Sequence, residues 1–251
     1  MKEMKKILIL LLFVSQSFWA QTAFDQGNKF YEKENYQAAI SSYESVANSG
    51  KQSAELYFNL GNCYYKLHKV APAIYNYEKA LLLNPNDTEI KTNLEFARKM
   101  AIDDIKVIPK VGFHKLIKDF TSNYHYDTWG WIAVSLAFVF LLFFIGYYFS
   151  QTTLLKRIFF LGMFVLLIGI SLSVSAGIYE KKQYENEKPA IVFAEIAMVK
   201  SEPKTTSPDA FVLHEGTKVY ILESIANWKK IELTDETTGW IEESAIREIK
   251  N

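Results

Sequence analysis

Residues 57–85 read YFNLGNCYYKLHKVAPAIYNYEKALLLNP and are the clearest guide to the architecture of this chain. The segment Asn59-Leu60-Gly61-Asn62 within them belongs to a pattern that recurs every 34 residues. The matching positions are Gly27 and Gly61, Asn28 and Asn62, Phe30 and Tyr64, Ala39 and Ala73, and Tyr43 and Tyr77. A fixed period of this length indicates stacked structural units, because one unit cannot bury its apolar face alone. Such a stack makes a binding surface rather than a catalytic centre.

The pattern resembles tetratricopeptide repeats, which are helix–turn–helix units. The resemblance places Tyr57, Leu60, Gly61 and Tyr64 on a first helix and Ala73, Tyr77 and Ala80 on a second, with Pro85 ending the unit. Gly61 and Ala73 are small where the two helices touch, and the aromatic side chains fill the gaps beside them.

An earlier unit follows the same pattern less completely, with Val46 in place of the usual alanine and Lys51 in place of the proline. Asn93-Leu94 repeats Asn59-Leu60, but Glu95 replaces the glycine, so we expect only a capping helix that ends near Met100. The resemblance therefore predicts an all-α tetratricopeptide-repeat solenoid over residues 21–100.

The composition sets broad limits on the function. The chain has 251 residues, with 28 basic and 28 acidic side chains. A formal charge of zero gives no argument for nucleic acid as a partner, because nucleic-acid binding usually needs a basic face.

The first residues have the features of a secretory signal, which we assign to residues 1–20. Lys2, Lys5 and Lys6 precede an apolar run that is too short to span a bilayer, and Ala20 is a plausible cleavage edge. Cys63 is the only cysteine, so the chain has no internal disulfide. Its place within the repeat favours a small buried hydrophobic residue over a redox role.

Two segments without charge, residues 129–149 and 158–178, are each about 30 Å long as helices and match the thickness of a bilayer. The connection Ser150–Arg157 is short, so the spans predict a transmembrane hairpin with both flanking regions on one side. Lysines on both flanks offset Lys156 and Arg157 of the loop, so charge alone does not fix the orientation. The signal-like start favours a periplasmic location for the repeats and the C-terminus, with the hairpin in a bacterial inner membrane.

The second span carries Gly169, Ser173 and Gly177 at four-residue spacing. Three small residues on one helix face allow another backbone to approach closely, either within the hairpin or from a second membrane protein. The juxtamembrane segment 101–128 contains Phe113, Leu116, Ile117 and Phe120 at helical spacing. This segment is expected either to lie in the membrane interface or to pack on the repeats.

Residues 179–189 are polar and predict a linker, and residues 190–251 carry short strand patterns that predict a small all-β barrel. Leu213-His214-Glu215-Gly216-Thr217, Trp228-Lys229-Lys230-Ile231 and Gly239-Trp240-Ile241 resemble segments of bacterial SH3-like domains. Trp240 is expected to fill the core, and Trp228 either fills the core or forms a contact surface. Glu242 and Ala245 replace the proline and tyrosine of polyproline-binding grooves.

The sequence contains no catalytic motif that we could identify. The four histidines do not have metal-ligand spacing, and no phosphate-binding glycine loop, HExxH or G-x-S-x-G motif occurs. We interpret the acidic pair Asp103-Asp104 as a solvated face. The expectation is a protein without enzyme activity, cofactor or metal.

The order of signal, repeats, two-span hairpin and SH3-like domain resembles BatE-type proteins of the Bacteroides aerotolerance (Bat) operon. The resemblance implies a scaffold in the bacterial envelope, linked to aerotolerance or oxidative stress. It also implies Bat membrane partners that carry von Willebrand factor A domains. A cell-wall sensor that binds peptidoglycan through the SH3-like domain is the alternative function.

The candidate peptide-binding groove lies on the first helices of the repeats. It comprises Asn28, Tyr31, Asn62, Tyr65 and Lys66. The asparagine amides can donate to and accept from an extended peptide backbone, while the tyrosines add apolar contact and Lys66 adds a positive charge. The alternative is that the two asparagines only bridge neighbouring helices.

Overall fold

The structure is a computed structural model that describes residues 23–106 and 112–250. The predicted signal segment 1–20 therefore lies outside the described residues. The chain divides into two compact units, one formed by residues 1–108 and 188–251 and the other by residues 109–187. Each unit is treated by itself below.

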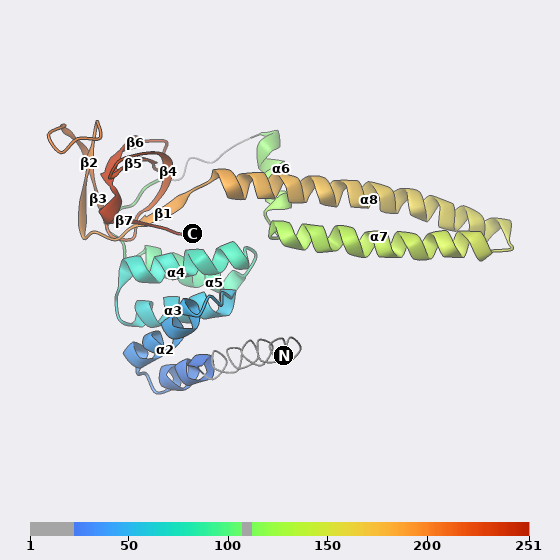
Figure 1. The fold of residues 1–251 in the computed structure, drawn as a ribbon, viewed down its shortest axis with the longest axis horizontal. Helices are drawn as coiled ribbons and strands as arrows, with labels where there is room; N and C mark the ends of the chain where they lie inside the picture. The colour runs from blue at the N-terminus through green and yellow to red at the C-terminus, as the bar shows by residue number, and fades with distance from the viewer. Residues whose placement is uncertain (1–22, 107–111, 251) are drawn as a thin grey trace, which may run out of the picture. The chain divides into compact units, whose positions relative to one another are not determined.

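The first unit begins with paired antiparallel helices, as the 34-residue pattern predicts (Figure 1). Residues 23–32 are helical, and they are followed by α2 (Tyr36–Asn48), α3 (Ala54–Lys66), α4 (Val70–Leu83) and α5 (Thr88–Arg98). Side chains cap three of these helices: Asn35 accepts from the backbone N–H of Ala38, Ser53 from Leu56, and Asp87 from Glu89 and Ile90. These bonds satisfy backbone donors that a helix start leaves without partners.

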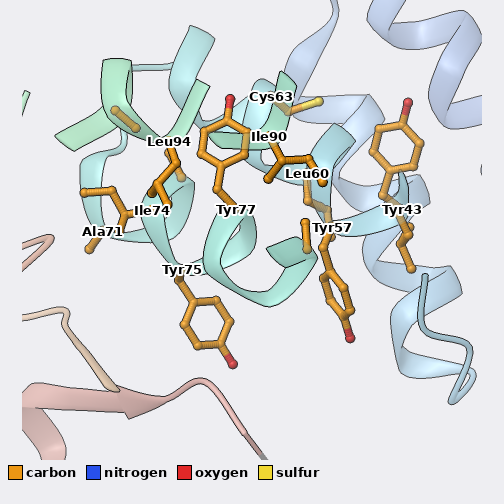
Figure 2. Close-up of a cluster of buried hydrophobic side chains, with 14 of the residues drawn as sticks. Tyr43, Tyr57, Leu60, Cys63, Ala71, Ile74, Tyr75, Tyr77, Ile90 and Leu94 are labelled. Carbon is orange, nitrogen blue, oxygen red and sulfur yellow. The ribbon is translucent and has the colours of Figure 1, made fainter. Parts of the chain in front are cut away.

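The core of the repeats is aromatic and aliphatic. Tyr43, Ile74 and Tyr77, which Figure 2 labels, are almost completely buried, and so is Leu56. Cys63 is buried among them, and burial raises the pKa of its thiol to about 12. The interpretation of Cys63 as a buried hydrophobic residue is therefore confirmed.

The C-terminal part of the first unit is an antiparallel sheet of seven short strands, which confirms the predicted all-β character of this part. The strands are β1 (Pro189–Val192), β2 (Ile196–Lys200), β3 (Asp209–His214), β4 (Lys218–Ile225), β5 (Trp228–Glu232), β6 (Thr238–Glu242) and β7 (Ile246–Glu248). Their order in the sheet is β3-β2-β6-β5-β4-β1-β7. Buried aliphatic residues, including Val192, Val199, Val219 and Ile231, form its core.

The sheet packs on the repeats through the turn between β3 and β4. Gly216 of this turn has a φ of +90°, which only glycine adopts without strain. A Cβ atom there would lie 2.9 Å from Val70 Cγ1 and 3.0 Å from Ile74 Cδ1. Gly216 therefore serves both the turn and the close approach to α4.

The second unit contains α6 (Phe113–Thr121), α7 (Tyr126–Phe149) and α8 (Thr153–Asn186). The helices α7 and α8 are long and apolar enough to cross a membrane. They lie side by side and meet at a tight connection (Figure 1).

Two details of the hairpin differ from the sequence prediction. The connection between α7 and α8 is residues 150–152 only, because Lys156 and Arg157 already belong to α8. The helix α8 also continues through residues 179–186, which we expected to be a linker. No proline or glycine interrupts that stretch, and Lys181 Nζ lies 3.8 Å from Glu185 Oε1 one turn later, so the polar residues extend the helix.

The juxtamembrane helix α6 is formed as the helical spacing predicts, and its Leu116 is 67% exposed. At its end, Thr121 Oγ1 donates to a carboxylate oxygen of Glu180 on α8, and Trp129 Nε1 donates to the carbonyl of Thr121 at 2.9 Å. These bonds hold the end of α6 against the hairpin.

Candidate binding groove of the repeats

The two asparagines of the predicted groove have the same hydrogen bonds, 34 residues apart. Asn28 Oδ1 accepts from Tyr43 Oη at 2.7 Å and from Asn59 Nδ2 at 3.3 Å. Asn62 Oδ1 accepts from Tyr77 Oη at 2.7 Å and from Asn93 Nδ2 at 3.0 Å. Each asparagine thus joins its own unit to the next first helix. The alternative interpretation, in which the two asparagines bridge neighbouring helices, therefore holds for their amide oxygens.

The tyrosine hydroxyls are fixed as donors in this network. Burial is the largest cause that raises the pKa of Tyr43 and of Tyr77 well above the ordinary value of a phenol. Both phenols therefore stay protonated at neutral pH, and their protons point to the asparagine oxygens. This fixes the orientation of each amide, because the oxygen is on the side of the donors.

The amide nitrogen of Asn62 has a different environment from its oxygen. Within the described part of the chain, no group accepts a hydrogen bond from Asn62 Nδ2. Asn62 is half-buried and lines a pocket of about 270 Å³. The oxygen of Asn62 thus joins the helices, while its Nδ2 donors are not used by any other described residue.

Four of the five predicted groove residues line this hollow, which we call the groove pocket. Its lining is Tyr31, Asn62, Tyr65, Lys66, Tyr77, Glu89, Asn93 and Phe96. Asn28, the fifth predicted residue, is not part of the lining. The pocket combines aromatic walls, amide groups and one charge of each sign, a combination suited to an extended peptide.

The sequence analysis missed the contribution of α5. Glu89, Asn93 and Phe96 come from this helix, which we had interpreted only as a cap. Phe96 is 49% exposed, so its ring is available for contact with a ligand in the pocket. The equivalence of Asn93 and Asn59 in the 34-residue pattern was the signal that pointed to a third wall.

The small residues of the second span lie against α7. Ser173 Oγ donates to the carbonyl of Trp129 at 2.8 Å, and a Cβ atom at Gly177 would lie 3.3 Å from Trp129 Cβ. A Cβ atom at Gly169 would lie 3.3 Å from Leu136 Cδ1. The three residues that we predicted as a packing face therefore face the partner helix of the hairpin.

The two tryptophans of the sheet occupy different environments. Trp240 on β6 is buried, as the sequence analysis predicted. Trp228 is half-buried at the start of β5, where it pairs with Glu242. The role of Trp228 as a contact residue stays a prediction.

The interpretation of Asp103 as a solvated residue is wrong. Its carboxylate accepts from the backbone N–H of His214 at 2.7 Å and from Thr217 Oγ1 at 2.6 Å. Burial opposes ionisation, but the hydrogen bonds from Thr217 and His214 hold the pKa of Asp103 below its usual value. Asp103 thereby fixes the β3–β4 turn, a contact between residues more than a hundred positions apart.

Comparison with known proteins confirms that the second 34-residue unit is a tetratricopeptide repeat. The sequence profile described as "Tetratricopeptide repeat" matches residues 54–87, which span α3 and α4. The protein "Dynein axonemal assembly factor 4" of Rattus norvegicus is 40% identical over 62 residues. The matched stretch covers 24% of this chain and 15% of that protein. The chain thus contains a tetratricopeptide repeat, a unit that points to protein–protein interaction.

Proposed function

We propose that this protein is a non-enzymatic membrane scaffold whose repeats bind an extended segment of a protein partner in the groove pocket. The observation that carries the proposal is the arrangement at Asn62. Its oxygen accepts from Tyr77 and Asn93, its Nδ2 has no acceptor among the described residues, and Asn62 lines a pocket with the exposed residues Phe96 and Lys66. A peptide carbonyl would complete the bonding of that amide, and the aromatic walls would cover the side chains.

We further propose that the hairpin α7–α8 holds the scaffold in a bacterial inner membrane, in contact with lipid, with the repeats and the sheet in the periplasm. Support comes from the signal-like start and from the two apolar helices. Cysteines placed at Gly50, Gln151 and Asp235 test this orientation with a reagent that cannot cross the membrane. We expect labelling at 50 and 235 only, and Cys63 gives no background because it is buried. Labelling at 151 alone would show that the orientation is the opposite of the proposed one.

The resemblance to BatE-type proteins gives the proposal its most specific form. In that form the partners are Bat membrane proteins with von Willebrand factor A domains, and the complex serves aerotolerance or the response to oxidative stress. The alternative in which the C-terminal module, proposed to be SH3-like, binds peptidoglycan is tested separately. Sedimentation of the purified chain with cell wall would support the alternative. If the chain does not sediment with cell wall, the scaffold function remains the proposal.

The groove is tested by removing donors without disturbing the helices. In Asn62→Asp, the carboxylate keeps both acceptor bonds to Tyr77 and Asn93 but loses the two N–H donors. We expect this variant, and Lys66→Ala, to weaken binding of a partner captured by crosslinking by about 1–3 kcal/mol each. The measurement is an affinity titration with that purified partner.

The matched control is Asn28→Asp, which makes the same chemical change in the equivalent network outside the groove pocket. It is expected to leave the affinity for the partner unchanged. Equal losses in Asn28→Asp and Asn62→Asp, or full affinity in both, would contradict the assignment of the groove pocket.

A further inference from the structure

A second and larger hollow lies on the other side of the repeat helices. Figure 2 shows the hydroxyl groups of Tyr43 and Tyr77 on one side and those of Tyr57 and Tyr75 on the other. Tyr57 and Tyr75 line a pocket of about 610 Å³, which we call the back pocket. Its wall is completed by Phe193 and by Arg247 on β7 of the C-terminal sheet. The back pocket therefore needs both the repeats and the sheet.

The charges of the back pocket are unequal. Its lining contains the cations Lys69, Lys79 and Arg247 and a single acid, Glu44, so three positive charges face one negative charge. Glu44 Oε1 accepts from Tyr64 Oη at 2.6 Å. Burial, followed by this hydrogen bond, raises the pKa of Tyr64, so the phenol stays protonated and donates to Glu44. This neutral donor leaves the charge of Glu44 in place, so the lining has an excess of two positive charges.

Two of the cations are held by aromatic faces. The guanidinium carbon of Arg247 is 4.2 Å from the ring centre of Phe193 and 5.6 Å from that of Tyr75. Lys79 Nζ is 5.1 Å from the ring centres of both Tyr57 and Tyr75. Among the described residues, no carboxylate forms a salt bridge with Arg247 or Lys79. Cation–π contact positions a charge but leaves its N–H donors available.

Two other cations of the first unit are different, because they form salt bridges. Lys218 Nζ is 2.7 Å from Glu78 Oε2, and Arg98 Nη2 is 2.7 Å from Glu78 Oε1. Lys218 and Arg98 thus share a carboxylate, whereas Arg247 and Lys79 of the back pocket have none among the described residues.

The lining of the back pocket contains side-chain amides that can bond to a peptide backbone. Asn76 is buried, and its Nδ2 donates to the carbonyl of Pro72 at 2.8 Å. Its Oδ1 accepts from no group in the described ranges. Two further amides, Asn48 and Gln52, lie in the same lining. Side-chain amides can donate to and accept from a peptide backbone, and the pocket volume of about 610 Å³ greatly exceeds that of a single inorganic anion.

We propose that the back pocket binds a short acidic segment of a partner protein, with carboxylates on Arg247 and Lys79 and the peptide backbone on the amides. The second site is independent of the groove pocket. It also gives the contact between sheet and repeats a function, because β7 supplies the arginine.

Hexaglutamate carrying a fluorescent label is the probe, with the full chain in a neutral detergent and fluorescence anisotropy as the measurement. We expect saturable binding below about 1 mM, whereas hexaglutamine does not bind. Arg247→Gln and Lys79→Gln are each expected to weaken binding by at least about tenfold, as for a lost hydrogen bond to a charged group. Lys91→Gln removes an exposed charge of α5 outside both pockets and should change the affinity less than about twofold.

Thermal melts of the wild type, Arg247→Gln, Lys79→Gln and Lys91→Gln ensure that only folded proteins are compared. Arg247→Lys is a milder change for use if Arg247→Gln unfolds. Arg247→Lys keeps the charge but loses the planar stacking, so it should bind more weakly than the wild type. Three outcomes would each overturn the proposal. The first is that hexaglutamate does not bind, and the second is that the pocket variants bind it as strongly as Lys91→Gln does. The third is that an equal concentration of inorganic phosphate displaces it fully. Asn62→Asp should leave hexaglutamate binding unchanged, which separates this test from that of the groove pocket.

Discussion

At the scale of single residues, the repeats depend on glycines that sit under tyrosine rings. A Cβ atom at Gly27 would lie 2.5 Å from Tyr43 Cε1, and one at Gly61 would lie 2.6 Å from the ring of Tyr77. The same rings carry the hydroxyls that bond to Asn28 and Asn62, the residues next to the glycines. Close approach and hydrogen bond therefore depend on each other, which explains why the glycine–asparagine pair recurs.

The first stability prediction concerns Gly61→Ala. The added methyl group would force the Tyr77 ring to move, and this motion would stretch its bond to Asn62. Overpacking of a core typically costs about 1–3 kcal/mol, so we expect a loss of that size in the free energy of unfolding. Chemical denaturation followed by circular dichroism measures it.

Gly130→Ala serves as the control for the helix propensity of alanine. Nothing lies within 4 Å of a Cβ atom added at Gly130, on α7. Alanine there is expected to be neutral or slightly stabilising. A Gly61→Ala variant as stable as the wild type would show that the ring of Tyr77 can move without loss.

At the scale of elements, the hairpin packs through small residues of both helices. Beyond the predicted face, a Cβ atom at Gly146 would lie 2.7 Å from Phe159 Cζ, and one at Gly162 would lie 2.3 Å from Phe143 Cε1. The two phenylalanines also contact each other edge to face, with ring centres 5.6 Å apart. Each helix thus gives a glycine that receives an aromatic ring of the other.

The hairpin prediction is that Gly169→Leu combined with Gly177→Leu loosens the contact between α7 and α8. Side chains at these positions block the approach of Leu136 and Trp129, so the pairing should weaken by about 1 kcal/mol or more. Thermal stability in detergent and crosslinking between cysteines placed on the two helices measure the effect. Val165→Leu, on an exposed part of α8, should leave both unchanged. Unaltered crosslinking in the double variant would rule out this packing face.

At the scale of the whole chain, the repeats and the sheet are joined by buried charge. Glu78 of α4 is buried and accepts from Lys218 of β4 and from Arg98 of α5. Burial opposes its ionisation, but the two cations hold the pKa of Glu78 below the ordinary value. Asp103 forms a second link, to the β3–β4 turn, and its pKa is also low.

Sequence reasoning reached the elements but not these links. The 34-residue period predicted the repeat helices because the buried residues of a helix recur on one face. Short alternating runs predicted the strands because every second residue of a strand points to the same side of the sheet. The 34-residue period also grouped five residues, since residues at equivalent places share one face. Four of them line the groove pocket and Asn28 does not. Spacing along the chain cannot show which distant residue covers a face. The sequence analysis therefore gave no role to Glu78, and it did not predict the contact of Arg247 with the rings of Phe193 and Tyr75.

The last prediction is that acid separates or unfolds the joined repeats and sheet, and that Glu78 carries much of this effect. A carboxyl group with a lowered pKa contributes stability above its unfolded pKa, and that contribution disappears as the pH falls through its folded pKa. Ordinary carboxyl pKa values are about 4, so the free energy of unfolding should fall as the pH decreases below about 4. Urea denaturation at several pH values, followed by tryptophan fluorescence, to which the buried Trp240 contributes, gives the profile.

Glu78→Gln tests the assignment, because it removes the charge while it keeps the size of the side chain. Lys218 is then left largely buried without its counter-charge, which should lower the stability at pH 7 by about 3 kcal/mol. The same variant should lose less stability on acidification than the wild type, because one titrating group is gone. Glu95→Gln removes an exposed partner of Arg98 and is expected to change stability by less than about 1 kcal/mol at every pH. An acid profile of Glu78→Gln as steep as that of the wild type would show that other carboxylates join the two parts.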